Sequence, residues 1–299
     1  MNKLGSEIFM PVTKSPLRYP GGKTQLSTYV KHLLKINKVT NTYIEPFAGG
    51  FGVGLDLLID GSVENVVIND LDPSIYSVWY YILNEPSKFI SKIEDVPITM
   101  EEWYKQRKIR DEVEKEISLD NAFATFFLNR TNVSGIINGG PIGGKKQTGK
   151  YKINCRFNKE RLIKKIQVIA SYKERISLTN MDANDFILNQ IPEYNSKNTF
   201  IFFDPPYYTQ GKNLYLSFVD KNKHQRLSEN IIGLKKYKWI ITYDIEPEIL
   251  KLYEPYIKAY TYHLNYSANK KRRAKEYMFI NNNTKADSFE KVELEEIRV

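Results

Sequence analysis

Short hydrophobic runs recur along the whole chain and alternate with segments of helical periodicity. We predict that seven of these runs are strands, at residues 42–45, 66–69, 176–179, 199–203, 238–243, 256–263 and 276–281. Strands that alternate with helices are typical of an α/β protein with a doubly wound sheet. Only the short segment 265–275, which has no helical periodicity, separates the last two runs. We therefore expect these two runs to form an antiparallel hairpin at one side of the sheet.

The periodic segments between the strands predict helices and a division of the chain. The first helix is amphipathic, and its apolar face comprises Leu26, Val30, Leu33 and Leu34. A second, apolar helix runs through residues 55–58, and a third, buried one covers residues 122–130. The region 86–175 contains helical patterns but no clear strand. It is predicted to be an inserted domain within a domain formed by residues 1–85 and 176–299.

Charge distinguishes the inserted region from the rest. The chain carries a net charge of +9, yet residues 121–175 alone hold twelve Lys and Arg against the two acids Glu160 and Glu174. A basic surface of this kind favours a polyanionic partner, most simply nucleic acid, because phosphates exchange their counterions for basic side chains. A run of solvated charges with no partner is the alternative that this feature alone leaves open.

Composition excludes several classes of protein. The 299 residues are 41% hydrophobic and 26% charged, no apolar run approaches the length of a membrane span, and the N-terminus lacks the apolar core of a signal peptide. A cytoplasmic protein is therefore expected. One cysteine, Cys155, and three histidines argue against a disulfide framework and against a cysteine- or histidine-rich metal site, so no metal is expected.

The hydrophobic strand 199–203 runs directly into Asp204-Pro205-Pro206-Tyr207. Two consecutive prolines lack backbone N–H groups and force an extended turn, which ends the strand and fixes its neighbours. Such a turn suits a planar ring that bears an amine. The Asp204 carboxylate and the Pro205 carbonyl can accept the two amine protons, while Tyr207 offers a face for stacking. A simple proline stop at a strand end is the structural alternative.

A glycine-rich turn, residues 49–54, follows the first predicted strand. Leu55 stands where the dinucleotide-binding pattern requires glycine, so a nicotinamide enzyme is disfavoured. Asp70 ends the second strand about 20 residues later, where an acid commonly accepts the hydroxyls of a ribose. A helix N-cap for the segment that starts at Asp72-Pro73 is the other interpretation of Asp70.

Gly21-Gly22-Lys23-Thr24 invites comparison with a phosphate-binding P-loop. The comparison fails, because Leu17 occupies the position of the required first glycine and no strand precedes it. A lysine at a helix start can still bind an anion or a carboxylate, or it can be merely solvated.

Within the basic region, residues 131–146 form a polar loop with five glycines and two lysines at its end. Such a loop either connects two helices or follows a groove of DNA and contacts phosphates. Its place in the basic region favours the second role. With the basic residues that follow it, the loop gives the predicted DNA-contacting residues Asn132, Lys145, Lys146, Lys150 and Arg156.

Taken in order, these segments resemble the Dam-type DNA adenine-N6 methyltransferases, which use S-adenosylmethionine. The matching blocks are residues 17–23, 45–50, 69–70, 129–130 with Gly135, and 204–207. They span nearly the whole chain, with the cofactor motif first, the target-recognition domain in the middle and Asp-Pro-Pro-Tyr last. The resemblance implies a Rossmann-like methyltransferase sheet of seven strands with a mainly helical target-recognition lobe inserted.

The resemblance also implies roles for individual residues, among them contacts of Arg18 and Arg130 with DNA. Asp204, Pro205, Pro206 and Tyr207 would be catalytic, Asp70 would bind the cofactor ribose, and Asp182 would lie near the cofactor adenine. The implied cofactor site as a whole comprises Tyr19, Lys23, Glu45, Phe47, Gly49, Asp70, Asp182 and Asp204. Segments 139–144 and 156–159 do not match the part of familiar members that reads GATC, so the recognition sequence stays open.

The expected substrate is double-stranded DNA, from which the target adenine must leave the base stack before its amine can reach a methyl donor. Methylation of RNA or of a protein amide is one rival, because a relative of the motif with asparagine serves such groups. A DNA-binding module with a decayed cofactor site is the other. We further expect a monomer, a cognate restriction endonuclease as partner, and a bacterial or phage origin with association to the nucleoid.

Overall fold

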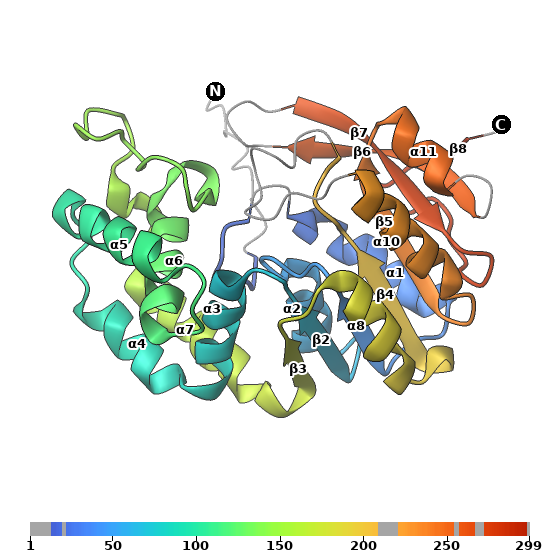
Figure 1. Cartoon of the computed structure of the whole chain (residues 1–299), viewed down its shortest axis with the longest axis horizontal. Coiled ribbons are helices and arrows are strands. Elements are labelled where there is room, and N and C mark those ends of the chain that lie inside the picture. Colours follow the sequence, from blue (N-terminus) through green and yellow to red (C-terminus); the bar gives the residue numbers. More distant parts are fainter. Residues whose placement is uncertain (1–12, 20–21, 209–220, 254–256, 267–271, 298–299) are drawn as a thin grey trace, which may run out of the picture.

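The computed structural model describes residues 13–19, 22–208, 221–253, 257–266 and 272–297. Its centre is a sheet of eight strands in the order β3-β2-β1-β4-β5-β7-β6-β8 (Figure 1). The strands are β1 (Thr42–Glu45), β2 (Asn65–Asn69), β3 (Ile176–Thr179), β4 (Thr199–Phe203), β5 (Lys238–Asp244), β6 (Lys258–Tyr266), β7 (Arg272–Ile280) and β8 (Glu295–Glu296).

Strands β1 to β5 are parallel, whereas β5–β7, β7–β6 and β6–β8 pair antiparallel. The strand order reverses at β1, because the chain continues outward to β2 on one side and later returns to β4 on the other. Ligands of open α/β sheets bind at the carboxyl ends of the strands that flank such a reversal. The ends of β1 and β4, at Glu45 and Phe203, therefore mark the expected site.

Helices cover both faces of the sheet (Figure 1). One face packs against α1 (Ser27–Ile36), α2 (Gly52–Ile59) and α3 (Pro73–Asn84), and the other against α8 (Ala183–Asn189), α10 (Lys221–Gly233) and α11 (Pro247–Tyr253). Strand β4 shows why this works. Its residues Phe200 and Phe202 join one hydrophobic cluster, and Ile201 and Phe203 join the other. A strand buried on both faces is a continuous hydrophobic run, which is how the sequence revealed it.

The region 86–175 is helical and gathers at one end of the molecule, on the left in Figure 1. It contains α4 (Pro86–Asp95), α5 (Met100–Val113), α6 (Leu119–Thr131) and α7 (Lys159–Ser171). Polar side chains fix three of the helix starts: Thr99, Ser118 and Asn158 each accept a backbone N–H of the first turn. Short 3₁₀ helices are η1 (Lys23–Leu26), η2 (Val133–Gly135), η3 (Ile153–Arg156), η4 (Lys173–Arg175), η5 (Ile191–Glu193) and η6 (Ser196–Asn198).

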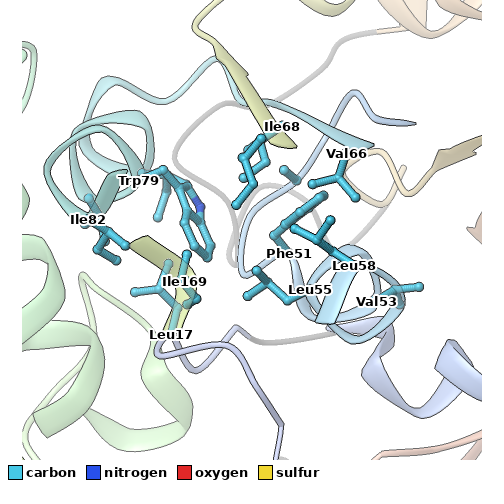
Figure 2. Close-up of a cluster of buried hydrophobic side chains, with 14 of the residues drawn as sticks. Leu17, Phe51, Val53, Leu55, Leu58, Val66, Ile68, Trp79, Ile82 and Ile169 are labelled. Atoms are coloured by element: carbon cyan, nitrogen blue, oxygen red, sulfur yellow. The ribbon is translucent and has the colours of Figure 1, made fainter. Parts of the chain in front are cut away.

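The helical region shares a hydrophobic core with the sheet. In Figure 2, Ile169 of α7 and Leu17 of the N-terminal segment lie beside Trp79 of α3. Phe51 and Leu55, at the start of α2, belong to the same cluster. All five side chains are buried. Packing across the proposed boundary is therefore continuous, and the helical region cannot separate from the sheet without exposing this core.

Each predicted helix and strand corresponds to an observed one, with two corrections at the C-terminal side of the sheet. Backbone pairing continues through Tyr266 and Arg272, which lie inside the segment 265–275 that the hydrophobic pattern predicts to be a loop. Polar side chains hid this extension from the pattern, because strand pairing uses backbone groups alone. Strand β8, with only two glutamates, was not predicted for the same reason. The expected leader up to Pro11 lies outside the described residues.

No helix in the described part of the chain is both long enough and apolar enough to cross a membrane.

Removing packing between α7 and the sheet domain tests the shared core. We expect Ile169→Ala, at a fully buried side chain, to lower the free energy of unfolding by roughly 2–5 kcal/mol. The neighbouring Val168, whose exposed fraction is 37%, provides the matched control, and Val168→Ala is expected to change stability by less than about 0.5 kcal/mol. Urea unfolding followed by tryptophan fluorescence measures both. Equal effects of the two substitutions would contradict the shared core.

Candidate active site

A cavity of about 350 Å³ opens at the carboxyl ends of β1 and β4, where the strand order predicts a site. The structure brings together around it all eight residues of the cofactor site implied by the sequence: Tyr19, Lys23, Glu45, Phe47, Gly49, Asp70, Asp182 and Asp204. They come from segments between residues 19 and 204, so only the fold makes them neighbours. Their individual roles stay predictions.

The glycine-rich turn after β1 forms part of the cavity wall. Gly49 has a φ of +46°, in the left-handed region, and a Cβ atom there would lie 2.7 Å from Cε1 of the Tyr19 ring. Any side chain at position 49 would therefore displace Tyr19. On the other side of the turn, Nε1 of Trp79 donates a hydrogen bond to the Gly49 carbonyl over 2.9 Å. The turn is thus held from α3 and from the N-terminal segment together.

Asp70 bridges the end of β2 and the glycine-rich turn. Its carboxylate accepts the backbone N–H of Gly49 at 2.8 Å and that of Asp72 at 3.0 Å. Burial, followed by the nearby charge of Asp72, raises the pKa of Asp70 to about 7. Asp72, not Asp70, caps helix α3 by accepting the N–H of Ser74. The helix-cap interpretation of Asp70 is therefore wrong.

Glu45 ends strand β1 beneath the cavity. Its Oε1 accepts hydrogen bonds from the Tyr43 hydroxyl at 2.9 Å and from the Gly54 backbone at 3.1 Å. Burial raises the pKa of Glu45 from 4.5 to about 8; the Tyr43 bond opposes this shift, and the charge of Asp204 adds to it. The cavity floor therefore contains a carboxyl group that changes charge near neutral pH.

Asp204 is the first residue after β4, and two side chains hold one of its oxygens. Oδ1 accepts Lys23 Nζ at 2.8 Å and the Thr242 hydroxyl at 2.9 Å. Neither of these two bonds involves Oδ2, so the contacts among the described residues leave that oxygen for a ligand. Burial raises the pKa of Asp204, and the adjacent Lys23 ammonium opposes the shift.

Lys23 begins η1 and is 5% exposed. Besides Asp204, its Nζ donates to the Tyr207 hydroxyl at 3.0 Å and lies 3.8 Å from Oε2 of Glu276. The glycine-lysine segment therefore does bind a carboxylate, as one alternative from the sequence predicted, and this carboxylate belongs to the protein itself. The interpretation of Lys23 as a solvated lysine is wrong.

Tyr207 differs from its predicted arrangement. Its side chain is 7% exposed, it does not line the cavity, and its hydroxyl donates to Oε1 of Glu276 over 2.6 Å. The ring centroid lies 5.0 Å from Lys23 Nζ. Interior partners of the hydroxyl thus draw the ring away from the cavity, so this structure does not present it as an open face for stacking. Pro206, its neighbour, does line the cavity.

Arg18, Arg130 and Arg156 lie close to one another, and Arg18 lines the cavity. Arg18 donates from Nη1 to the Asn132 carbonyl at 2.9 Å, while Arg130 donates from Nε to the Arg156 carbonyl at 2.9 Å. Burial, followed by the charges of Arg18 and Arg156, lowers the pKa of Arg130 to about 9. No ion pair between described residues includes any of the three. Mutually repelling cations of this kind favour an anionic partner.

The remaining predicted DNA-contacting residues divide into two groups. Lys145, Lys146 and Lys150 are exposed, as a phosphate contact requires. Asn132 has no exposed surface: its Oδ1 accepts Trp103 Nε1 at 2.7 Å, and its Nδ2 donates to two loop carbonyls. The prediction of a direct DNA contact by Asn132 is therefore corrected, because its amide is already engaged inside the loop that it shapes.

The loop after α6 also reaches the cavity. The Asn129 side chain accepts the Arg18 N–H at 2.8 Å and donates to the carbonyls of Arg18 at 2.7 Å and Gly135 at 2.9 Å. At Gly135, with φ +78°, a Cβ atom would lie 2.1 Å from the Arg18 carbonyl oxygen. Ser134, the preceding residue, lines the cavity. The basic lobe and the cavity are thus joined at one point.

A family model describes most of the chain: the D12 class N6 adenine-specific DNA methyltransferase model matches residues 19–255. The chain belongs to this family. It is thus a DNA adenine methyltransferase, and the resemblance found in the sequence is confirmed.

Two relatives of this methyltransferase are named Type II methyltransferases. M.MjaIII of Methanocaldococcus jannaschii is 27% identical over 235 residues, which cover 74% of this chain and 78% of the relative. M.CviBI of Paramecium bursaria Chlorella virus NC1A is 28% identical over 246 residues, which cover 82% of this chain and 88% of the relative.

Solved structures resemble the methyltransferase only distantly. The rRNA methyltransferase aviRa from Streptomyces viridochromogenes aligns over 89% of this chain and 86% of its own, with a TM-score of 0.36 and 12% identity. TrmK of M. capricolum, in complex with S-adenosylhomocysteine, aligns over 87% and 71%, with a TM-score of 0.35 and 9% identity. Similarity at this level carries no argument about the reaction.

Sequence reasoning missed three residues around the site. The pattern shows Thr242 only as part of a buried strand, although a hydroxyl near the carboxyl end of β5 lies beside the end of β4 in a parallel sheet. Glu276 lies at the border between the basic first half and the apolar second half of β7, and nothing in the pattern marks it as buried. Trp79 fits the apolar face of α3, and nothing in the pattern indicates its bond to Gly49.

The raised pKa of Glu45 predicts how stability depends on pH. Because the folded protein holds this proton up to about pH 8 and the unfolded chain releases it near pH 4.5, stability falls as pH rises from 6 to 8. One such group contributes at most about 1.4 kcal/mol per pH unit. We expect Glu45→Gln to reduce the fall in melting temperature between pH 6 and pH 8. Glu94→Gln, at an exposed acid, is the control, and an unchanged pH dependence in Glu45→Gln would contradict the raised pKa.

Proposed function

We propose that this methyltransferase transfers a methyl group from S-adenosylmethionine to the N6 amine of an adenine turned out of duplex DNA, with Asp204 as the residue that engages the amine. One observation carries the proposal: Asp204 lines the same cavity as the implied cofactor residues, and its carboxylate is fixed through Oδ1 alone. A fixed carboxylate beside a cofactor-sized cavity supports methyl transfer to a group that donates hydrogen bonds.

The residues around the cavity fit S-adenosylmethionine, which supplies a methyl group bound to a positively charged sulfur. Glu45, Asp70 and Asp204 place three acids around the cavity, with Lys23 as their close cation. Burial raises the pKa of all three, and a bound cation favours their ionised forms, so the set complements a sulfonium. Asp70 would exchange part of its backbone bonding for the ribose hydroxyls, and Phe47 offers apolar surface.

Asp182 has a more restricted role. Its side chain is exposed toward the cavity, but Oδ1 already accepts the Asn184 N–H at 2.9 Å and caps helix α8. We therefore assign its other oxygen to the cofactor adenine.

The chemistry follows from the state of the amine. The lone pair of an aromatic amine is delocalised into the ring, so the nitrogen is a poor nucleophile. Accepting one amine proton at Asp204 and the other at the Pro205 carbonyl favours a tetrahedral nitrogen whose lone pair points out of the ring plane. Positioning and preorganised acceptors then supply the remaining rate enhancement, and no metal takes part.

The adenine must leave the base stack to reach this site, at a cost of a few kcal/mol that contacts to the DNA offset. We assign those contacts to the region 86–175 as target-recognition domain, with Arg18, Arg130 and Arg156 near the cavity and the exposed lysines farther along the loop. Stacking on Tyr207 requires its ring to reach the cavity. In the arrangement described here, the Tyr207 hydroxyl instead contacts Lys23, and we assign Tyr207 the role of supporting Lys23 and Asp204.

The family argues against RNA or a protein amide as the substrate, and the cavity with its acids argues against a decayed cofactor site. Three features stay predictions: the monomeric state, the cognate restriction endonuclease, and the cytoplasmic location with association to the nucleoid. The sequence predicts no recognition site.

Substitution of Asp204 tests the catalytic assignment. We expect Asp204→Ala to lower methyl transfer by at least roughly 100-fold, because the amine loses its charged acceptor. Binding of S-adenosylmethionine, measured by calorimetry, is expected to stay partly intact. Transfer is measured as tritiated methyl incorporated into an adenine-containing duplex, followed by digestion to nucleosides and identification of N6-methyladenine.

Glu248→Ala removes an exposed acid on α11 and serves as the control with unchanged activity. Full activity of Asp204→Ala would refute the assignment of Asp204, whereas a methylated product other than N6-methyladenine would refute the proposed acceptor.

Removal of loop charges tests the DNA-binding surface. Replacing Lys145, Lys146 and Lys150 together by alanine is expected to weaken binding to duplex DNA. It should also flatten the dependence of log Kd on log salt by about 0.9 for each phosphate that the variant no longer neutralises. Fluorescence anisotropy between roughly 50 and 200 mM salt, the range over which such affinities change steeply, measures both effects.

The matched control replaces the exposed lysines Lys35, Lys235 and Lys236, which lie outside the region 86–175. If both triple variants show the same salt slope, the loop is not part of the interface.

A further inference from the structure

Glu276 is a buried acid that neither the cavity nor the proposed reaction uses directly. It lies in β7, opposite Tyr262 of β6 and Asp244 of β5, and its exposed fraction is 2%. Its two carboxylate oxygens accept different tyrosines: Oε1 accepts the Tyr207 hydroxyl at 2.6 Å, and Oε2 accepts the Tyr262 hydroxyl at 2.7 Å. A buried carboxylate is costly unless it is bonded in this way.

A continuous chain of contacts links Glu276 to Asp204. The Tyr207 hydroxyl, which donates to Glu276, accepts Lys23 Nζ at 3.0 Å, and the same Nζ donates to Asp204 Oδ1 at 2.8 Å. Lys23 Nζ also lies 3.8 Å from Oε2 of Glu276. One buried ammonium is therefore shared between two carboxylates, and Tyr207 lies between them.

The position of Glu276 limits what it can do. It is not among the residues that line the cavity, whereas Asp204 and Lys23 are. It therefore acts on ligands only through other side chains. It accepts the Tyr207 hydroxyl, and its charge attracts the same Lys23 ammonium that binds Asp204, so it influences how Lys23 holds Oδ1.

We propose that Glu276 is a positioning residue for methyl transfer, which orients Tyr207 and Lys23 and through them the carboxylate of Asp204. This inference rests on the proposed catalytic function of Asp204. It assigns a role in the reaction to the antiparallel part of the sheet, far along the chain from the motifs that mark the family.

The test is Glu276→Gln, which keeps the shape of the side chain and removes its charge. We expect the single-turnover rate of methyl transfer, with saturating S-adenosylmethionine and duplex DNA, to fall by roughly 10–100-fold. The Kd for S-adenosylmethionine is expected to stay within about twofold, because Glu276 does not line the cavity. A residue with only a structural role would not produce this separation.

The pH–rate profile gives a second, independent readout. Burial is the main cause that raises the pKa of Asp204, and the charge of Glu276 adds to it. Transfer needs Asp204 as a carboxylate, so its rate falls below this pKa. Loss of the Glu276 charge lowers the pKa, and the acidic limb of the profile should move to lower pH. The other groups that face Asp204 stay unchanged in this variant: Lys23, Glu45, Tyr43, Tyr243 and Thr242.

Tyr262→Phe is the matched control. It removes the other hydroxyl that Glu276 accepts, so it costs a buried hydrogen bond of the same kind, but it leaves the contacts from Glu276 to Tyr207 and Lys23 intact. We expect Tyr262→Phe to lower the melting temperature and to keep the rate and its pH profile close to those of the wild type.

The outcomes separate the two proposals. A wild-type enzyme that transfers no methyl group to adenine refutes the proposed function. An active wild type with unchanged rate and pH profile in Glu276→Gln refutes the positioning role alone, and so does an equal loss of rate in Tyr262→Phe. If Glu276→Gln does not fold, Tyr207→Phe removes the hydroxyl link instead, and a wild-type rate in that variant overturns the inference.

Discussion

The ion pair between the buried Lys23 ammonium and the partly exposed Asp204 carboxylate is the interaction on which the arrangement of the site depends. It joins residues 181 positions apart, at the N-terminal segment and at the end of β4, over 2.8 Å. Breaking a buried pair leaves an uncompensated charge, which costs several kcal/mol. The N-terminal segment is therefore tied to the sheet, and with it Tyr19 against Gly49 and Leu17 in the shared core. The same N-terminal segment thus forms part of the cavity wall and part of the hydrophobic core.

The segment around Arg18 also connects the cavity to the basic lobe. Asn129 binds both backbone groups of Arg18, and Gly135 approaches the Arg18 carbonyl so closely that no side chain fits there. A shift of the loop after α6 must therefore displace Arg18 and, next to it, Tyr19. The loop and the cavity wall therefore share one rigid contact at Arg18.

The sequence predicts those features that depend on local pattern. Strand β4 could be found because it is buried on both faces, and Asp204 because two prolines must end that strand. The burial of Asn132 could not be found, since it depends on Trp103 reaching it from another helix, 29 positions away. Glu276 is similar: alternation places it on one face of a strand, but only the antiparallel pairing brings Tyr262 opposite it. The long hairpin was underestimated because backbone pairing does not require apolar side chains.

Charge is separated within the molecule in a way that suits two substrates of opposite sign. The twelve basic residues of segment 121–175 favour the polyanion, whereas Glu45, Asp70 and Asp204 line the cavity that would take a cationic methyl donor. Arg18 lies where these two surfaces meet, because it lines the cavity and neighbours Arg130 and Arg156. In the proposed function, the cationic edge attracts the phosphates of DNA, whereas the acids of the cavity disfavour phosphates there and favour a cationic donor beside an uncharged base.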